Sequence, residues 1–473
     1  MSLKRILLVA LTAIVVFLVS AELLSSLTEP QVQGQISLYQ TNLVLQASEW
    51  SGFQEYPQAQ ALLGRDPQAD ARQAYEKTIQ SLRELPTPTA QQSQQISQAQ
   101  LNLGILEAVG AKTSTLAPQT WELVAATGPD SDRQLAQTLQ QLWQTPPIIT
   151  PQAEALITTH LTGWFQTQAR QRLYQVENNT AQLNTLQQTG QELAQAAVIR
   201  LALVAVLPLA GSVLGIILLV VWGINQYRHR EQVLPHLNLD IPWSSETTLA
   251  VMVGWFVAFF GISFLIVPLV LELIGGRGLV ATPFGQAIYA LITYSLMMVA
   301  GFGILIYTWQ QYPQPIFQWL SFSGKNRWWA WSFGAYFVAL PLVLLTSVFS
   351  QQLLHNQGGG NPLLEVILAS HDYRSFAILW FMVAVMAPIF EETLFRGFLL
   401  PSLLPSMRPV TAMLTSGGLF AIAHLNAADL LPLAVLGTIL GYVYWRSGNL
   451  LASMLLHGIW NSGSFIGLLL LSP

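Results

Sequence analysis

About nine apolar runs constrain this 473-residue chain more than any other feature. Each approaches the roughly 20 apolar residues that an α-helix needs to cross the hydrocarbon core of a bilayer. The runs cover residues 6–26, 201–224, 249–274, 283–308, 331–354, 374–400, 410–425, 430–446 and 450–471, and the seventh is short for a span. Because backbone polar groups in lipid must be satisfied within the segment, the pattern predicts an all-α, polytopic membrane helical bundle.

The composition excludes several other classes of protein. Hydrophobic residues make up 52% of the chain and charged residues only 9%. Soluble domains carry roughly 25% charged residues, so a water-soluble enzyme is not expected. The net charge of −4 offers no basic field for nucleic acid. The chain has no cysteine, which excludes disulfides, thiolate metal sites and a cysteine nucleophile.

Positive charge flanks the runs unevenly and predicts their orientation. The first run follows Lys4 and Arg5 and is longer than the roughly 7–15 apolar residues of a cleavable signal, so residues 1–26 are expected to form an uncleaved membrane anchor. If that end faces the cytosol, the cytosolic loops hold Arg228, His229, Arg230, Lys325, Arg327, Arg408 and Arg446, and the opposite loops hold only Arg200, Arg277 and Arg374. This excess predicts a cytosolic N-terminus. We expect an integral multi-pass protein of a bacterial plasma membrane or a thylakoid membrane.

Residues 27–197, between the first two runs, are polar, weakly charged and rich in glutamine. Apolar residues recur there at helical spacing, for example at Leu135, Leu139 and Leu142. We therefore predict an inserted soluble α-helical domain outside the cytosol. Residues 198–354 are then membrane helices that precede the core, and residues 355–473 form the core that carries the motifs described next.

Ionisable residues inside the apolar runs are few and gather late in the chain. A charged side chain costs about 2.5–3.5 kcal/mol at the membrane centre on insertion scales, so such residues mark functional sites. The sixth, seventh and ninth runs contain, in order, Glu391-Glu392-Thr-Leu-Phe-Arg396, Phe420-Ala-Ile-Ala-His424 and His457-Gly-Ile-Trp-Asn461.

Four-residue spacing separates the two glutamates. Glu392 and Arg396 stand at i and i+4 with the acid first, which is the favourable orientation for an ion pair. Glu391 has no such partner and is predicted to be the general base, with Glu392 as the orienting acid. His457 and Asn461 share one helix face and direct two hydrogen-bonding groups to the same point.

Each motif also has a purely structural interpretation. Glu392 and Arg396 could extend to the membrane interface, and His457 with Asn461 could join two packed helices. His424 could be a solvated residue near a loop. Three such motifs on three helices, with few other charges inside the runs, favour a functional site.

Taken together, the motifs resemble the intramembrane CAAX-protease and bacteriocin-processing (Abi) family, which is related to the type II CAAX prenyl endopeptidases. The pattern of that family is Glu-Glu-x-x-x-Arg, Phe-x-x-x-His and His-x-x-x-Asn on successive membrane helices, and every defining position is present between about residues 375 and 465. The resemblance implies an intramembrane endopeptidase that acts, in membrane lipid, on membrane-associated protein or peptide substrates.

The expected site comprises Glu391, Glu392, Arg396, His424, His457 and Asn461. In it, Glu391 takes a proton from a water that His424 orients, and His457 and Asn461 stabilise the oxyanion. No cofactor is certain, and zinc held by Glu391, His424 and His457 is the alternative within the same site, because these are zinc-ligand types. The sequence leaves the two chemistries open, since no His-Glu-x-x-His pair is present.

Other functions remain as alternatives. A serine rhomboid needs Gly-x-Ser-Gly, and Leu414-Thr-Ser416-Gly417 lacks the first glycine. A non-catalytic membrane scaffold, immunity or transport protein is the alternative from another class. The placement of residues 27–197 outside the membrane suggests that this domain binds a protein partner.

Overall fold

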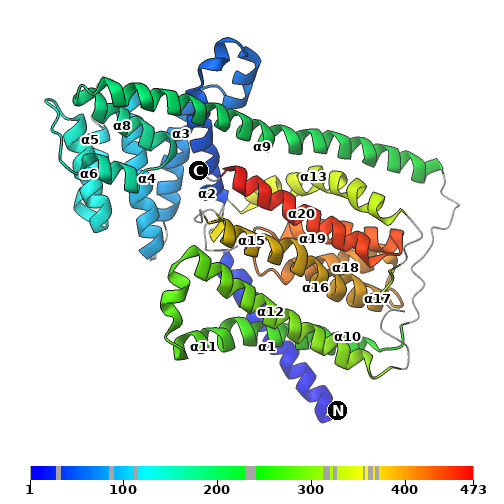
Figure 1. Cartoon of the computed structure of the whole chain (residues 1–473). Helices are drawn as coiled ribbons and strands as arrows, with labels where there is room; N and C mark the ends of the chain where they lie inside the picture. Colours follow the sequence, from blue (N-terminus) through cyan, green and yellow to red (C-terminus); the bar gives the residue numbers. More distant parts are fainter. Residues whose placement is uncertain are drawn as a thin grey trace. The chain divides into compact units, whose positions relative to one another are not determined.

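The computed structural model describes residues 2–27, 33–84, 90–110, 116–228, 241–312, 320–322, 327–354, 357–360, 366–367 and 372–471. Within these ranges the chain is helical, and one isolated bridge between Phe322 and Asn449 is the only β pairing. The chain divides into two compact units (Figure 1). We call Met1–Val32 with Pro208–Leu469 the membrane unit, and Gln33–Leu207 with Leu470–Pro473 the helical unit.

Eight helices among the described residues are long and apolar enough to cross a membrane, so the predicted all-α polytopic bundle is confirmed. They are α1 (Leu3–Ser26), α9 (Thr180–Arg228), α10 to α11 (Ser245–Phe260, π-helical η3 Gly261–Ile266, Val267–Leu273), α12 (Pro283–Trp309), α13 (Trp328–Leu353), α15 to α17 (Tyr373–Leu403), α19 (Leu430–Ser447) and α20 (Leu450–Leu471). The seventh apolar run forms a shorter helix of 14 residues, α18 (Pro409–Ile422). A short 3₁₀ helix, η4 (Gly276–Ala281), precedes α12.

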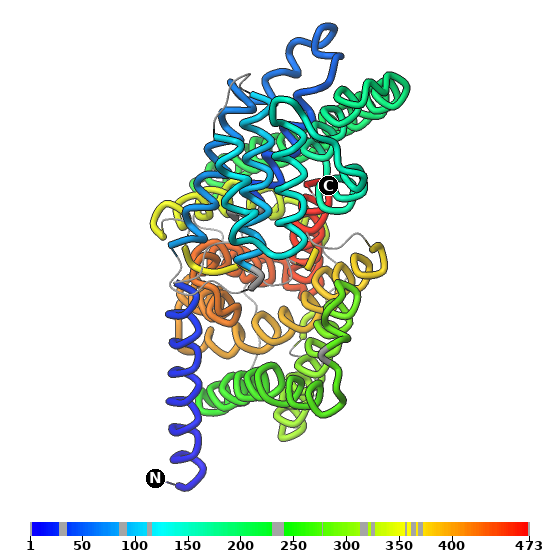
Figure 2. Tube along the Cα trace, turned by 90° about the vertical axis from the view of Figure 1, so that its left-hand side faces the viewer, coloured from blue at the N-terminus to red at the C-terminus, as the bar shows by residue number. Residues whose placement is uncertain are grey.

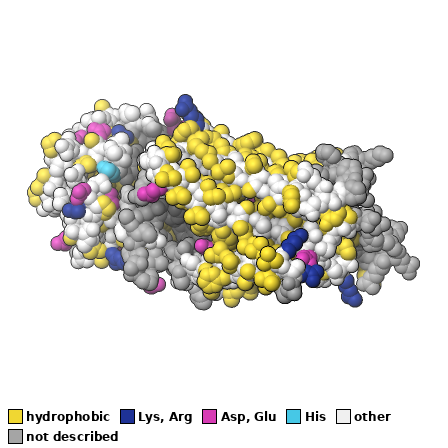
Figure 3. All heavy atoms as spheres, turned by 90° about the horizontal axis from the view of Figure 1, so that it is seen from below, with side chains coloured by type: hydrophobic (Ala, Val, Ile, Leu, Met, Phe, Trp, Pro, Cys, Tyr) yellow, Lys and Arg dark blue, Asp and Glu magenta, His cyan; other side chains and the backbone are white. Residues whose placement is uncertain are grey.

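The helix from α15 to α17 lies between α12 on one side and α18, α19 and α20 on the other (Figure 1). Helices α18 and α19 approach closely, since a Cβ on Gly437 would lie 2.8 Å from the Cα of Gly417. Small residues permit such close contact between membrane helices. The outer faces of the spans carry exposed apolar side chains, among them Phe17, Leu209 and Leu345. Hydrophobic side chains gather over much of the face that Figure 3 shows. This surface suits contact with lipid.

The helix with the two glutamates contains two π-helical segments. It runs through α15 (Tyr373–Phe381), η6 (Met382–Met386), α16 (Ala387–Glu392), η7 (Thr393–Leu399) and α17 (Leu400–Leu403). Each π segment is followed by a proline, Pro388 or Pro401, which has no backbone N–H to donate. Such π-helical turns are frequent at functional sites.

The helical unit consists of short helices that run side by side (Figure 2). They are α2 (Gln33–Ser48), 3₁₀ helices η1 (Ser51–Gln54) and η2 (Pro57–Leu63), α3 (Pro67–Arg83), α4 (Ala90–Gly110), α5 (Leu116–Thr127), α6 (Asp130–Trp143), α7 (Ala153–His160), α8 (Gly163–Val176) and the first part of α9. Their core contains the buried rings of Tyr75, Trp121 and Trp164. The boundary expected after residue 197 falls inside α9, which is one continuous helix.

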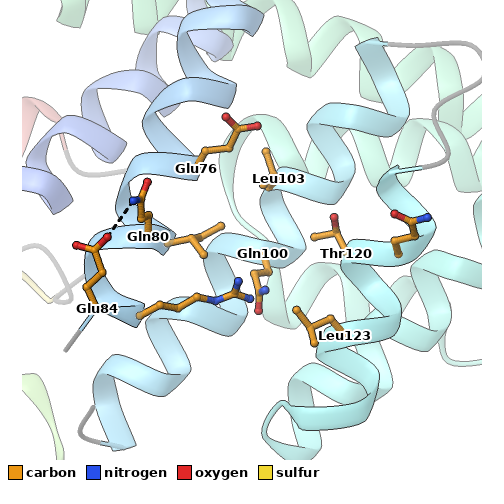
Figure 4. A pocket seen from close by; sticks show the side chains of 10 residues that line it. Glu76, Gln80, Glu84, Gln100, Leu103, Thr120 and Leu123 are labelled. Carbon is orange, nitrogen blue, oxygen red and sulfur yellow. Dashed lines mark hydrogen bonds between the residues drawn. The ribbon is translucent and has the colours of Figure 1, made fainter. Parts of the chain in front are cut away.

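A pocket of about 500 Å³ lies between α3, α4 and α5 (Figure 4). Its walls combine amide, acidic and apolar side chains: Glu76, Ile79, Gln80, Arg83, Glu84, Gln100, Leu103, Gln119, Thr120 and Leu123. The hydrogen bond from Gln80 to Glu84, 2.9 Å long, fixes part of one wall.

Candidate active site

A fully buried ion pair lies inside the membrane unit. Arg396 Nη1 is 2.7 Å from Glu392 Oε1, and neither side chain has any exposed surface. Arg396 Nη2 also donates a 2.8 Å hydrogen bond to the backbone carbonyl of Gly437 on α19. The four-residue spacing places both charges on one helix face, and the Gly437 contact attaches that face to a neighbouring helix.

His457 on α20 lies between the two glutamates. Its Nδ1 is 2.9 Å from Glu392 Oε1, and its Nε2 is 3.9 Å from Glu391 Oε2. Because a carboxylate accepts, Nδ1 carries the hydrogen of this contact. Glu392 Oε1 therefore accepts from both Arg396 and His457, while Oε2 makes no hydrogen bond with the described residues. The position of the His457 ring is thus set by Glu392, with its other nitrogen directed at Glu391.

Glu391 differs from Glu392 in its partners and its exposure. The Tyr294 hydroxyl on α12 donates a 3.0 Å hydrogen bond to Glu391 Oε1. The Glu391 side chain is 16% exposed, whereas that of Glu392 is fully buried. Glu391 is therefore the more accessible carboxylate of the two, and its partner on Oε1 is neutral rather than cationic.

His424 lies in the turn after α18 and is exposed. Its Nδ1 is 2.8 Å from the Phe420 carbonyl, and because a carbonyl accepts, Nδ1 carries the hydrogen of this contact. The Phe420 ring meets the rings of both His424 and His457, with centroids 4.8 Å and 5.7 Å apart, and the Arg396 guanidinium lies over it at 4.6 Å. Phe420 is thus the link between His424 and the other site residues.

Asn461 does not hydrogen-bond to His457 or to either glutamate in this arrangement. Its Nδ2 instead donates a 2.7 Å hydrogen bond to the backbone carbonyl of Val383, in η6. One of the two amide hydrogens is used in this way, and the second makes no hydrogen bond with the described residues.

Glu391, His424 and His457 do not fit a zinc site in this arrangement. Among the residues that the structure describes, no group of three or more His, Asp or Glu side chains is placed to hold a metal ion. His457 directs one nitrogen at Glu392, and His424 reaches the site only through the Phe420 ring. The donor types are those of zinc enzymes, but their placement does not form the required cluster.

Two contacts of the site have no motif in the sequence. Tyr294 lies in an apolar run with no charged residue near it, so nothing marks it as a partner of Glu391. The second contact, from Asn461 to the Val383 carbonyl, involves a backbone group that no side-chain motif marks. The sequence feature that could have indicated it is Pro388, five residues further on, because a proline has no N–H and leaves a carbonyl in the preceding turn unpaired.

The fold and the site define an integral multi-pass membrane protein with a carboxylate, histidine and arginine cluster buried between its helices. Residues 373–463 match the family model described as type II CAAX prenyl endopeptidase Rce1-like. The segment from α15 into α20 is therefore similar to that domain, which confirms the predicted resemblance to the CAAX protease family. The match includes all six predicted site residues and excludes Tyr294. Comparisons with curated proteins and with solved structures find no match.

Proposed function

We propose that the protein is an intramembrane endopeptidase that hydrolyses peptide bonds of membrane-associated proteins or peptides, with Glu391 as the general base. The observation that carries the proposal is the pair of unlike glutamates. Glu392 is buried and bound to Arg396, whereas Glu391 is partly exposed and faces His457 without a cation bound to it. A free carboxylate held beside a fixed histidine is suited to general base catalysis.

Water is the nucleophile in this mechanism. The 3.9 Å between Glu391 Oε2 and His457 Nε2 exceeds a direct hydrogen bond, so both atoms can contact one water molecule. Glu391 takes a proton as the water oxygen attacks the scissile carbonyl carbon. The protonated Glu391 then gives that proton to the leaving amine as the C–N bond breaks. His424 contacts the described site residues through the Phe420 ring, and its role in orienting the water stays a prediction.

The oxyanion is stabilised by His457 and the second amide hydrogen of Asn461. His457 acts from Nε2, the ring nitrogen that faces Glu391 and the water. Its other nitrogen, Nδ1, is held by Glu392 Oε1, so the ring keeps one orientation toward the developing oxyanion.

The test is cleavage of a membrane-anchored reporter peptide by the purified protein in liposomes. Glu391→Gln preserves the shape of the side chain but cannot accept the proton, so turnover should fall by about a hundredfold or more. Near-normal turnover in this variant would overturn the proposed role of Glu391. A wild-type protein that cleaves no peptide across a panel of reporters would favour the scaffold, immunity or transport alternative.

The helical unit is proposed to bind a protein partner or a substrate segment on the side of the membrane opposite the cytosol. The pocket between α3, α4 and α5 supports this role, since amide side chains donate to and accept from a peptide backbone (Figure 4). Leu123 lines this pocket and its side chain is exposed, so the larger side chain of Leu123→Trp would occupy the pocket. It should raise KM for a full-length substrate but not for a short membrane peptide, whereas the exposed Gln187→Trp on α9 should change neither.

A further inference from the structure

Tyr294 contacts the proposed general base from outside the segment that matches the family model. It lies on α12, and its hydroxyl is 3.0 Å from Glu391 Oε1. In Figure 1, α12 runs beside α15 and α16, the part of the chain that leads to Glu391. None of the three sequence motifs includes this tyrosine.

We propose that Tyr294 is a positioning residue that fixes the carboxylate of Glu391, so that Oε2 is the oxygen that receives the proton of the water. The proposal rests on the function proposed above. Tyr294 does not contact the reacting atoms in this arrangement. It acts by holding one oxygen of the base while the other faces His457 Nε2 at 3.9 Å.

A glutamate carboxylate needs such a contact to keep one orientation. Its terminal torsion is broad and two-fold, so an unrestrained carboxylate would turn freely relative to the His457 ring. A hydrogen bond to one oxygen removes that freedom. The donor to Glu391 is a neutral phenol, in contrast to the cationic Arg396 that is bound to Glu392.

The packing of α12 against α16 explains why the hydroxyl reaches Glu391. Gly301 lies seven residues, or two helical turns, after Tyr294, and therefore on the same face of α12. A Cβ on Gly301 would overlap the ring of Phe390, the neighbour of Glu391. The rings of Phe302 and Phe390 also meet edge to face at 5.3 Å. Close approach of the two helices at this point brings the tyrosine within hydrogen-bonding distance.

The first measurement is turnover of the membrane-anchored reporter by Tyr294→Phe, which retains the ring and removes the hydroxyl. We expect kcat to fall by about tenfold to a hundredfold, the range for one hydrogen bond to a charged group. KM should stay unchanged, since the hydroxyl is not placed to bind substrate. Tyr289→Phe, on the same helix, is the matched control and should retain wild-type kcat and KM.

The second measurement does not depend on activity. In an infrared spectrum of protein with ¹³C-labelled glutamate, the carboxylate band of Glu391 is the one lost in Glu391→Gln. That band should shift in Tyr294→Phe and not in Tyr289→Phe. An unshifted band overturns the positioning role, even if kcat falls.

The combined results separate the two proposals. If Glu391→Gln is inactive while Tyr294→Phe has wild-type kcat, the positioning role is wrong and the proposed base stands. If Glu391→Gln remains active, Glu391 is not the base, and the positioning role fails with it. A lowered kcat, an unchanged KM and a shifted band together support both proposals.

Discussion

The side chain of Asn461 on α20 donates a hydrogen bond to the backbone carbonyl of Val383, at 2.7 Å. The carbonyl is available because the π-helical turn disturbs the backbone pairing of its own helix. The Ala387 N–H bonds to the Met382 carbonyl, and the next residue, Pro388, has no N–H. Asn461 therefore replaces a missing backbone donor and joins α20 to the helix just before Glu391.

This contact predicts that Asn461 stabilises the protein as well as serving the reaction. Asn461→Ala leaves a part-buried carbonyl unpaired, which should lower the free energy of unfolding by about 1–3 kcal/mol. Pro388→Ala restores an N–H near that carbonyl, so the cost of Asn461→Ala should shrink in that background. Thermal unfolding of the four variants in detergent measures the coupling.

The exposed Ser464→Ala, on the same helix, is the control and should show no coupling to Pro388→Ala. Strictly additive effects of Asn461→Ala and Pro388→Ala would contradict the assigned pairing.

The site could be predicted from the sequence where its contacts run along one helix. The spacing of Glu392 and Arg396 indicated their ion pair, because residues four apart lie on the same helical face. Contacts between helices could not be read in this way. Tyr294 is 97 positions from Glu391. The spacing of residues within an apolar helix does not indicate which other helix will pack against it.

His424 shows a second limit of reasoning from spacing. The Phe-x-x-x-His motif suggested a helical pair, but α18 ends at Ile422 and Leu425 adopts a positive φ of 54°. His424 consequently lies in a turn and is exposed, linked to the other site residues through the Phe420 ring. The fold class was easier to predict, since long apolar runs leave few alternatives to a helix.

Glu392 and Arg396 should behave as one unit in mutagenesis. Glu392→Gln or Arg396→Gln alone leaves one charge unpaired in a fully buried site, which should cost about 3–5 kcal/mol and reduce the amount of protein in the membrane. The double variant should recover abundance and some cleavage relative to either single variant. Membrane levels and turnover of the four proteins form the cycle.

The exposed pair of Asp130 and Arg133 provides the comparison, because its side chains are 91% and 47% exposed. Exposed pairs contribute little, so the corresponding cycle there should show almost no coupling. If the effects at Glu392 and Arg396 simply add, Glu392 acts independently of the arginine and must be given a direct role in the reaction.

The proposed topology can be tested with single cysteines, since the chain contains none. Gln94 is an exposed residue of α4, and Arg228 is an exposed residue at the end of α9. The two test variants are Gln94→Cys and Arg228→Cys. An impermeant maleimide applied to intact cells should label the first and not the second. Both should react after the membrane is permeabilised. Equal labelling of the two positions in intact cells would show that the proposed orientation is wrong.

Asp132 should make the helical unit less stable at neutral pH than at acidic pH. The residue is 2% exposed, Ser131 donates to its Oδ1 at 3.2 Å, and its Oδ2 makes no hydrogen bond with the described residues. Burial raises the pKa of Asp132, and the nearby His160 offsets this only in part. The folded unit thus holds this proton more tightly than the unfolded chain does. Its stability is greatest below the ordinary pKa of aspartate and falls as the pH rises toward the raised value.

Asp132→Asn removes the cost of the buried charge and should therefore stabilise the unit at pH 7. An increase of about 1 kcal/mol would correspond to a rise of about 2–4 °C in the unfolding temperature, measured by thermal proteolysis of the full-length protein. At pH 3 the two proteins should unfold at nearly the same temperature, because the aspartate is then protonated. Asp70→Asn, an exposed residue in the first turn of α3, is the matched control and should give no such pH-dependent gain. A stabilisation by Asp132→Asn that is equal at both pH values would arise from packing and not from the buried charge.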